Sequence, residues 1–316
     1  MGTAYTYQAY GLTLRVPFVC SGLSTGDPGT PPDLEVVEGE VPATLAAAEL
    51  RGDGFEAAPG RLLLELGRFS GRFLVENGRR VTFQRGSTAE EAALGYHLIN
   101  SIMAAVMRQR GYLVMHASVA ARGSTAIMVM GVSGAGKSTT LAALCARGWS
   151  MLSDDVTVLQ RSLAGEIQVL PGVPQVSLFE HTAQRLDMDV AGQPLYPWRR
   201  MKALIPSPAP TSSEPVPLRT VFILELGSGP TLEREKMLGA QRFGALYDGL
   251  YGPVLPSEYA GILPLHAAMT NQTTVFRLRR PSEPWSVDDV VAQITEDAFP
   301  PGDTGRSGAG GHAAEG

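Results

Sequence analysis

The feature that most constrains this chain is a glycine-rich segment near its middle. Residues 131–138 read Gly-Val-Ser-Gly-Ala-Gly-Lys-Ser and fit the pattern G-x-x-x-x-G-K-[ST] without a mismatch. An apolar run at 126–130 precedes the segment, and a helical pattern over 137–147 follows it and is ended by Gly148. This order of strand, loop and helix predicts an α/β layer with at least partly parallel pairing, built around a phosphate-binding loop.

Each position of the loop has a physical task. The glycines let successive backbone N–H groups converge on one anion at the positive end of the following helix. Lys137 brings a mobile charge to the β- and γ-phosphates, and the Ser138 hydroxyl is a usual Mg²⁺ ligand. We therefore expect ATP and Mg²⁺ as cofactors; the alternative is an ordinary glycine-rich turn with a solvated lysine. The expected nucleotide-contacting residues are Gly131, Ser133, Gly134, Ala135, Gly136, Lys137, Ser138 and Thr139.

Two adjacent carboxylates follow the loop helix. Asp154 and Asp155 lie within 150–159, an otherwise apolar run that predicts one strand. Successive side chains of a strand point to opposite faces, so we expect the two carboxylates to have different tasks. One can hold Mg²⁺ and the other can accept the proton of an attacking hydroxyl. The spacing does not decide which is which, and a solvated strand end is the alternative.

Three segments together carry a family resemblance. His116-Ala117-Ser118, the glycine-rich loop and Ser153-Asp154-Asp155 resemble, in order and spacing, the kinase domain of HPr kinase/phosphorylase, over about residues 90–280. The resemblance implies an α/β P-loop kinase domain, related to the C-terminal domain of HPr kinase and to phosphoenolpyruvate carboxykinase, that acts on a protein serine. It implies Asp154 as the leading base, and Asp155 as a metal ligand beside Ser138 or as the partner of His116.

The N-terminal part resembles shorter relatives of that family. Residues 7–12 are similar to a Tyr-x-x-x-Gly-Leu phrase in HPr-kinase-related proteins of peptide-modifying gene clusters, including lasso-peptide clusters. That resemblance implies a Ser or Thr hydroxyl on a peptide or protein as the phosphate acceptor. Residues 170–175 replace the glycine-rich, glutamate-containing phrase of the bifunctional enzymes, so we expect no phosphorylase activity. Full-length members are hexameric, which makes a homo-oligomer possible.

Other functions fit the same residues. A small-molecule kinase would use the same loop and base with a closed pocket. A nucleotide-dependent switch or assembly factor would hydrolyse the nucleotide without phosphorylating an acceptor.

Several further side chains are candidates with ordinary alternatives. His116 can orient an acidic residue, or it can be a core histidine bonded to backbone. Lys202, with Arg199 and Arg200, can neutralise transition-state charge, or all three can be solvated. Tyr196 and Trp198 can stack on a base or pack locally. His181 and His266 have no companions at metal-ligand spacing, and Ser118 lacks the tight turn of a hydrolase nucleophile.

The chain is expected to divide at residue 87. Residues 1–87 read as β-rich, with a hairpin turn at Asn77-Gly78. A P-loop kinase domain over 88–299 begins with a helix at 88–110, introduced by a capping box of Thr88 and Glu91. Residues 300–316 are predicted to be a disordered tail.

Composition narrows the partners and the compartment. The formal net charge of -5 gives no general basic field, so nucleic acid is not expected to bind. No window approaches eighteen uninterrupted apolar residues, so no membrane association is expected. The two cysteines form no disulfide framework, and the cytoplasm is the expected location.

Overall fold

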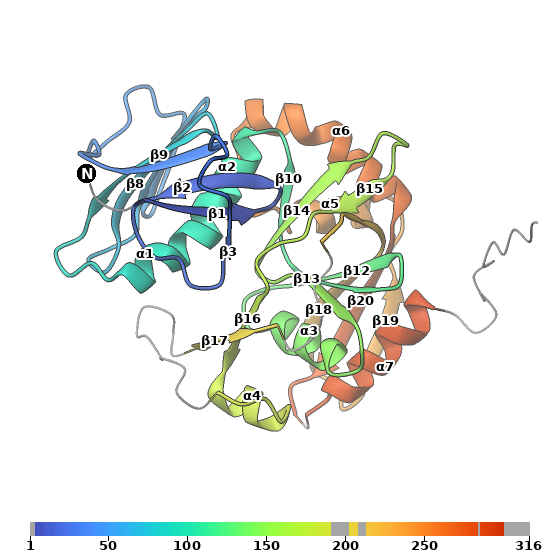
Figure 1. The fold of residues 1–316 in the computed structure, drawn as a ribbon. Coiled ribbons are helices and arrows are strands. Elements are labelled where there is room, and N and C mark those ends of the chain that lie inside the picture. Colours follow the sequence, from blue (N-terminus) through green and yellow to red (C-terminus); the bar gives the residue numbers. More distant parts are fainter. Residues whose placement is uncertain (1–3, 191–201, 208–212, 284, 300–316) are drawn as a thin grey trace, which may run out of the picture.

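The computed structural model describes residues 4–190, 202–207, 213–283 and 285–299. The predicted tail at 300–316, and Tyr196, Trp198, Arg199 and Arg200, lie outside the described residues. Two larger sheets lie next to each other, and helix α2 (Met103–Gln109) contacts strands of both (Figure 1). The coarse class, a mixed α/β protein, is as the sequence predicts.

The first sheet is formed by the N-terminal part. Its strand order is β3-β1-β2-β4-β9-β8-β7-β6-β5, with parallel pairing only of β4 with β2 and β9. The predicted turn at Asn77-Gly78 joins two paired strands, and both residues have a positive φ, 51° and 63°. The strands are β1 (Tyr5–Ala9), β2 (Leu12–Val16), β3 (Ser24–Thr25), β4 (Leu34–Glu38), β5 (Leu50–Gly52), β6 (Phe55–Ala58), β7 (Arg61–Glu65), β8 (Gly71–Glu76) and β9 (Arg80–Arg85).

The predicted helix at 88–110 is present but interrupted. It consists of α1 (Glu91–His97), a π-helical turn η1 (Leu98–Ile102) and α2. The predicted capping box is wrong, because α1 is preceded by Glu90 without a side-chain cap, and the Thr88 hydroxyl instead donates to the carbonyl of Arg68. The wide π turn has no signature in the apolar spacing that predicted the helix.

The second sheet contains the predicted strand, loop and helix. Its order is β10-β14-β15-β18-β12-β11-β13, and β20 pairs with β18 and β19. Parallel pairing is confined to β12–β18–β20, while β13, the next strand after the loop helix, pairs antiparallel with β11. The strands are β10 (Leu113–His116), β11 (Ser118–Arg122), β12 (Thr125–Met130), β13 (Ser150–Ser153), β14 (Val156–Arg161), β15 (Ile167–Val169), β18 (Val216–Gly227), β19 (Glu233–Lys236) and β20 (Thr274–Pro281).

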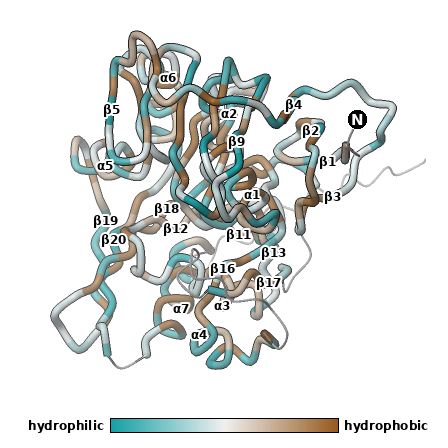
Figure 2. The backbone as a smooth tube through the Cα atoms, turned by 90° about the vertical axis from the view of Figure 1, so that its left-hand side faces the viewer, coloured by the Kyte–Doolittle hydropathy of each residue, from teal (hydrophilic) through white to brown (hydrophobic). Residues whose placement is uncertain are grey.

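Helices cover both faces of this sheet, which explains why residues 221–224 of its central strand β18 are apolar on both faces. On β18, Phe222 and Leu224 belong to the core under α3 (Lys137–Cys145) and α7 (Val287–Ala298). Val221 and Ile223 belong to the core under α5 (Gly239–Tyr247) and α6 (Pro256–Gln272). Figure 2 lets the reader follow these apolar runs along the backbone. A small two-stranded antiparallel sheet of β16 (Gln175–Phe179) and β17 (Lys202–Pro206), with α4 (Glu180–Arg185), lies beside α3.

The N-terminal sheet shares its core with the second sheet. One continuous cluster of buried side chains joins Leu14 and Phe83 of the first sheet, Leu98 of the helical segment, and Val156 and Val158 of β14. The chain boundary at residue 87 stays a prediction, but the packing across it predicts that the two parts unfold together.

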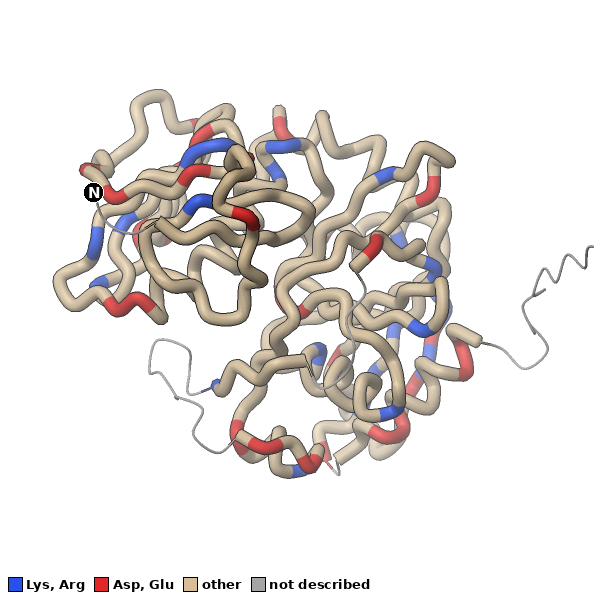
Figure 3. Tube along the Cα trace, viewed as in Figure 1, with Lys and Arg blue, Asp and Glu red and all other residues tan. Residues whose placement is uncertain are grey.

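Charged residues of both signs are interspersed along the chain in both parts, as the backbone tube of Figure 3 shows. Among the described helices, none is both long enough and apolar enough to cross a membrane.

Leu98→Ala tests the shared core. Leu98 has no exposed surface, and truncating such a leucine costs about 2–5 kcal/mol. Urea denaturation followed by far-UV circular dichroism and by tryptophan fluorescence should give one transition, shifted to lower urea by both probes. Leu163→Ala, at a fully exposed position, is the control and should leave the midpoint unchanged. Two separate transitions, only one of them shifted, would contradict a shared core.

Candidate active site

The glycine-rich loop connects the end of β12 to the start of α3. Gly131, Gly134 and Gly136 have φ angles of 142°, 88° and 109°, which side-chain-bearing residues rarely adopt. A Cβ at Gly131 would lie 2.3 Å from the carbonyl oxygen of Leu224 on β18. These positions therefore require glycine, as the pattern predicts.

The side chain of Lys137 folds back over the loop. Its Nζ donates to the carbonyl oxygens of Gly131, at 2.9 Å, and Val132, at 3.4 Å. Burial lowers the pKa of Lys137, and the negative charges of Asp155 and Asp154 partly offset this effect. The ammonium group is thus held among carbonyls at the mouth of the loop, where an anion would be a stronger partner.

Asp154 and Asp155 form a tight turn, where the sequence predicted one strand. β13 ends at Ser153 and β14 begins at Val156. The N–H of Val156 donates to the carbonyl oxygen of Asp154 at 2.9 Å, and Asp155 between them has a φ of 71°. A three-residue turn with this positive φ is rare and strained. The turn, and not the alternation of a strand, separates the two carboxylates.

Asp154 accepts three hydrogen bonds. Ser118 Oγ donates to Oδ1 at 2.6 Å, Ser138 Oγ to Oδ1 at 3.0 Å, and the backbone N–H of Ser177 to Oδ2 at 3.1 Å. Burial raises the pKa of Asp154, and the nearby Asp155 adds to that effect, while the three donors oppose it. The three groups that donate hydrogen bonds to this carboxylate are therefore all neutral.

Asp155 is paired with His116. His116 Nδ1 lies 2.9 Å from Asp155 Oδ1, and the imidazole also contacts Tyr251 edge to face, with ring centroids 5.6 Å apart. Burial alone would raise the pKa of Asp155, but the hydrogen bond and charge of His116, with Lys137 and Lys202, outweigh it and lower the pKa. Asp155 is therefore the readily ionised carboxyl of the two.

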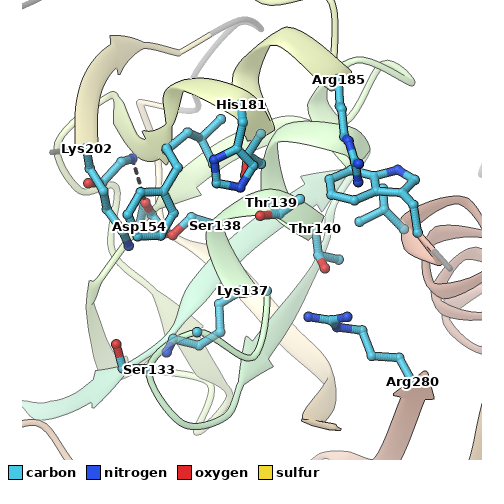
Figure 4. A pocket seen from close by; sticks show the side chains of 18 of the residues that line it. Ser133, Lys137, Ser138, Thr139, Thr140, Asp154, His181, Arg185, Lys202 and Arg280 are labelled. Carbon is cyan, nitrogen blue, oxygen red and sulfur yellow. Dashed lines mark hydrogen bonds between the residues drawn. The ribbon is translucent and has the colours of Figure 1, made fainter. Parts of the chain in front are cut away.

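These groups line one groove of about 440 Å³. Figure 4 shows Lys202 and Asp154 at one end, Thr139 and Thr140 along the loop helix, and Arg185 and Arg280 at the other end. Arg280 donates to the carbonyl oxygen of Ala135 behind the loop. The guanidinium of Arg185 lies 5.0 Å from the ring centre of Trp285, so this far end is aromatic and cationic.

A second cavity of about 560 Å³ begins where the groove ends. It shares His116 with the groove and is lined by Gly131 and Val132 of the loop. Its other wall is residues 249–251, whose backbone bonds to β10 through the N–H of His116 and the N–H of Tyr251. The His116–Asp155 pair thus lies between the two cavities.

Most of the predicted site residues come together. The groove is lined by His116, Ser133, Gly134, Gly136, Lys137, Ser138, Thr139, Asp154, Asp155 and Lys202. Gly131 lines the second cavity, and Ala135 is buried beneath the loop. His181 lines the groove, whereas His266 is buried in α6 with Tyr259 and lines neither cavity.

Sequence reasoning did not find the groove's far end, because Arg280 and Trp285 have no motif around them. It also did not find Ser177, whose backbone N–H donates to Asp154. One signal was available for Arg280, because it lies near the carboxyl end of a strand, where ligands bind in open α/β sheets.

Comparison with known proteins adds little. No protein-family model matches the chain, and no curated protein is similar to it. A solved structure, the Hpr(Ser) kinase/phosphatase from Coxiella burnetii, superposes with a TM-score of 0.28 and 12% identity, covering 58% of this chain and 90% of that chain. A score this low establishes neither a common fold nor a common activity.

The opposite pKa shifts of the two carboxyls predict opposite pH effects on stability. Asp154 has a folded pKa raised above its ordinary 3.8, so its stabilising contribution is complete below pH 3.8 and is lost as pH rises through the folded value. Asp155 has a folded pKa below 3.8, so its contribution is present above pH 3.8 and is lost as pH falls through the folded value.

Urea denaturation of the wild type, Asp154→Asn and Asp155→Asn between pH 4 and pH 8 in EDTA tests these signs. The stability of the wild type relative to Asp154→Asn should decrease as pH rises. Its stability relative to Asp155→Asn should stay level over this range and decrease only in more acidic solution. The same trend for both pairs would show that the carboxyls are not differentiated.

Proposed function

We propose that this chain is an ATP- and Mg²⁺-dependent phosphotransferase that phosphorylates a Ser or Thr hydroxyl of a peptide or protein. One observation carries the proposal. Ser138, at the start of the loop helix, is bonded to Asp154, and the separate Asp155–His116 pair lies in the same groove. A loop for phosphates, a metal-ligand pair and an independent base are the parts that phosphoryl transfer to a hydroxyl needs.

Ser138 and Asp154 are the residues that would hold Mg²⁺. Mg²⁺ prefers oxygen ligands and is commonly bound by one or two carboxylates together with substrate phosphates. Asp154 is buried with a raised pKa and only neutral donors, so a cation would stabilise its ionised form. When bound, Mg²⁺ supplies charge neutralisation at the β- and γ-phosphate oxygens.

Asp155 is the base in this proposal. Its lowered pKa keeps it ionised near neutral pH, and His116 bonds to Oδ1. An acceptor hydroxyl can then give its proton to Asp155 as it attacks. The assignment differs from the family resemblance in taking Asp155 as the base in place of Asp154, because Ser138 contacts Asp154. The contact of Asp155 with His116 agrees with one of the two alternatives that the resemblance implies for Asp155.

We infer the orientation of the nucleotide from the residues that line the two ends of the groove. With the γ-phosphate beside Ser138, Asp154 and Lys202, the α-phosphate and nucleoside extend along α3 toward Arg280 and Trp285. In-line transfer requires the acceptor to approach from the opposite side. The second cavity, of about 560 Å³ and sharing His116 with the groove, is the position proposed for the acceptor.

The direct test is transfer of labelled γ-phosphate from ATP·Mg²⁺ to Ser- and Thr-containing peptides, including those encoded beside the gene. We expect label on a peptide hydroxyl with the wild type. Removing a general base typically costs about 10²- to 10⁴-fold, so Asp155→Asn should lose most of the rate. Lys137→Ala should also lose it, through the lost phosphate contact.

Lys236→Ala and Asp53→Asn are the matched controls. Both change exposed residues that line neither cavity, and both variants should transfer phosphate normally. Free labelled phosphate released equally by the wild type and Asp155→Asn, with no peptide labelled, would contradict peptide phosphorylation. Label on a small molecule would keep the chemistry and replace the acceptor.

Trp285→Ala tests the orientation of the nucleotide. Stacking of a base on an aromatic ring is worth about 1–3 kcal/mol, so calorimetry should show ATP·Mg²⁺ binding weakened by roughly 5- to 150-fold. Mg²⁺-tripolyphosphate, which lacks a base, should bind both proteins alike. Equal losses for the two ligands, or no loss for ATP, would show that the base lies elsewhere.

A further inference from the structure

A side chain of the N-terminal sheet contacts the turn that carries both carboxylates. Tyr10 lies at the tip of the β1–β2 hairpin, and its hydroxyl donates to the carbonyl oxygen of Val156 at 3.1 Å. Val156 is the third residue of the Asp154–Asp155 turn, since its N–H closes that turn. Tyr10, which lies 146 positions before Val156 in the chain, is therefore hydrogen-bonded to the backbone of this turn.

The hairpin is itself unusual at this position. Ala9 pairs with Leu12, so Tyr10 and Gly11 form a two-residue loop, and both have a positive φ, 52° and 75°. Such loops strongly favour Asn or Gly at the first position. A bulky aromatic residue with positive φ is an outlier that local turn chemistry does not explain. Its contacts outside the hairpin provide the reason for a tyrosine.

Those contacts are specific and almost completely buried. Tyr10 is 5% exposed. Its ring is so close to Gly172 that a Cβ there would lie 3.2 Å from Tyr10 Cε1. With Tyr96 and Asn100 of the helical segment, Tyr10 lines a small cavity of about 30 Å³ whose other wall includes Asp154 and Asp155. The N-terminal part thus forms the back of the active site.

The hydrogen bond has a mechanical consequence. A strained turn persists only where its surroundings determine it, and Asp155 has a positive φ in the conformation in which its carboxylate faces His116. Burial, and then the charge of Asp155, raise the pKa of Tyr10, so its hydroxyl keeps its proton and keeps donating.

We propose that Tyr10 is a positioning residue of the active site, which fixes the 154–156 turn through the Val156 carbonyl and so holds Asp155 against His116. The role in turnover rests on the proposed phosphotransferase function; the role in holding the turn does not. The β-rich N-terminal part is accordingly a structural component of the site.

Tyr10→Phe is the test, because it removes the hydroxyl and keeps the ring. Tyr7→Phe is a matched control: Tyr7 is equally buried on the same hairpin, but its hydroxyl accepts from the N–H of Cys20. Hydrogen exchange of peptides covering 152–158 in the free protein should become about ten-fold faster in Tyr10→Phe and remain unchanged in Tyr7→Phe.

Turnover should follow the same pattern. In the phosphotransfer assay, Tyr10→Phe should lower kcat about ten-fold, because a small displacement of the base is costly, and leave the KM for ATP within about two-fold. Tyr7→Phe should match the wild type in both constants. A merely structural role would change the two variants alike.

Two results would overturn the proposal. One is exchange over 152–158 that is the same in Tyr10→Phe as in the wild type, which would mean that the hydroxyl does not hold the turn. The other is faster exchange with an unchanged kcat, which would mean that the turn does not control the base. Absence of any phosphotransfer by the wild type would refute the proposed function, and the exchange experiment would still decide whether Tyr10 holds the turn.

Discussion

The tight turn at Asp154–Asp155 is the constraint on which the candidate site depends. It places one carboxyl against Ser138, in the first turn of the loop helix, and the other against a histidine of the neighbouring strand. The positive φ of Asp155 costs about 1–3 kcal/mol, so the turn requires support from several elements. That support comes from Ser118 and Ser177 at the first carboxylate, His116 at the second and Tyr10 at the turn's end.

Asp154 and Asp155 are neighbours in the chain, but their surroundings shift their pKa values in opposite directions. Burial and the nearby Asp155 raise the pKa of Asp154, and the three neutral donors around it only partly oppose this effect. Asp155 faces His116 and two lysines, which lower its pKa. Pairs of titratable groups whose pKa values are driven apart are typical of sites that divide roles between two acids. Here the division would be between holding a cation and accepting a proton.

The sequence predicted the local parts of this site well and its assembly poorly. The loop between β12 and α3 could be predicted because glycine spacing, the preceding apolar run and the helical pattern are all local. The pairing of Asp154 with Ser138 could not, because an apolar run does not reveal the turn that interrupts it. The groove's aromatic end, with Trp285, and the support from Tyr10 depend on tertiary contacts between segments far apart in the chain.

In the proposed division of roles, Asp154 holds the metal and Asp155 accepts the proton. A Mg²⁺ titration of ATP binding, by calorimetry, to the wild type, Asp154→Asn and Asp155→Asn tests this division. We expect Asp154→Asn to weaken the Mg²⁺-dependent binding about ten-fold or more, and Asp155→Asn to leave it close to the wild type. Loss of Mg²⁺ dependence in Asp155→Asn, with Asp154→Asn unaffected, would show that the roles are assigned to the wrong carboxyls.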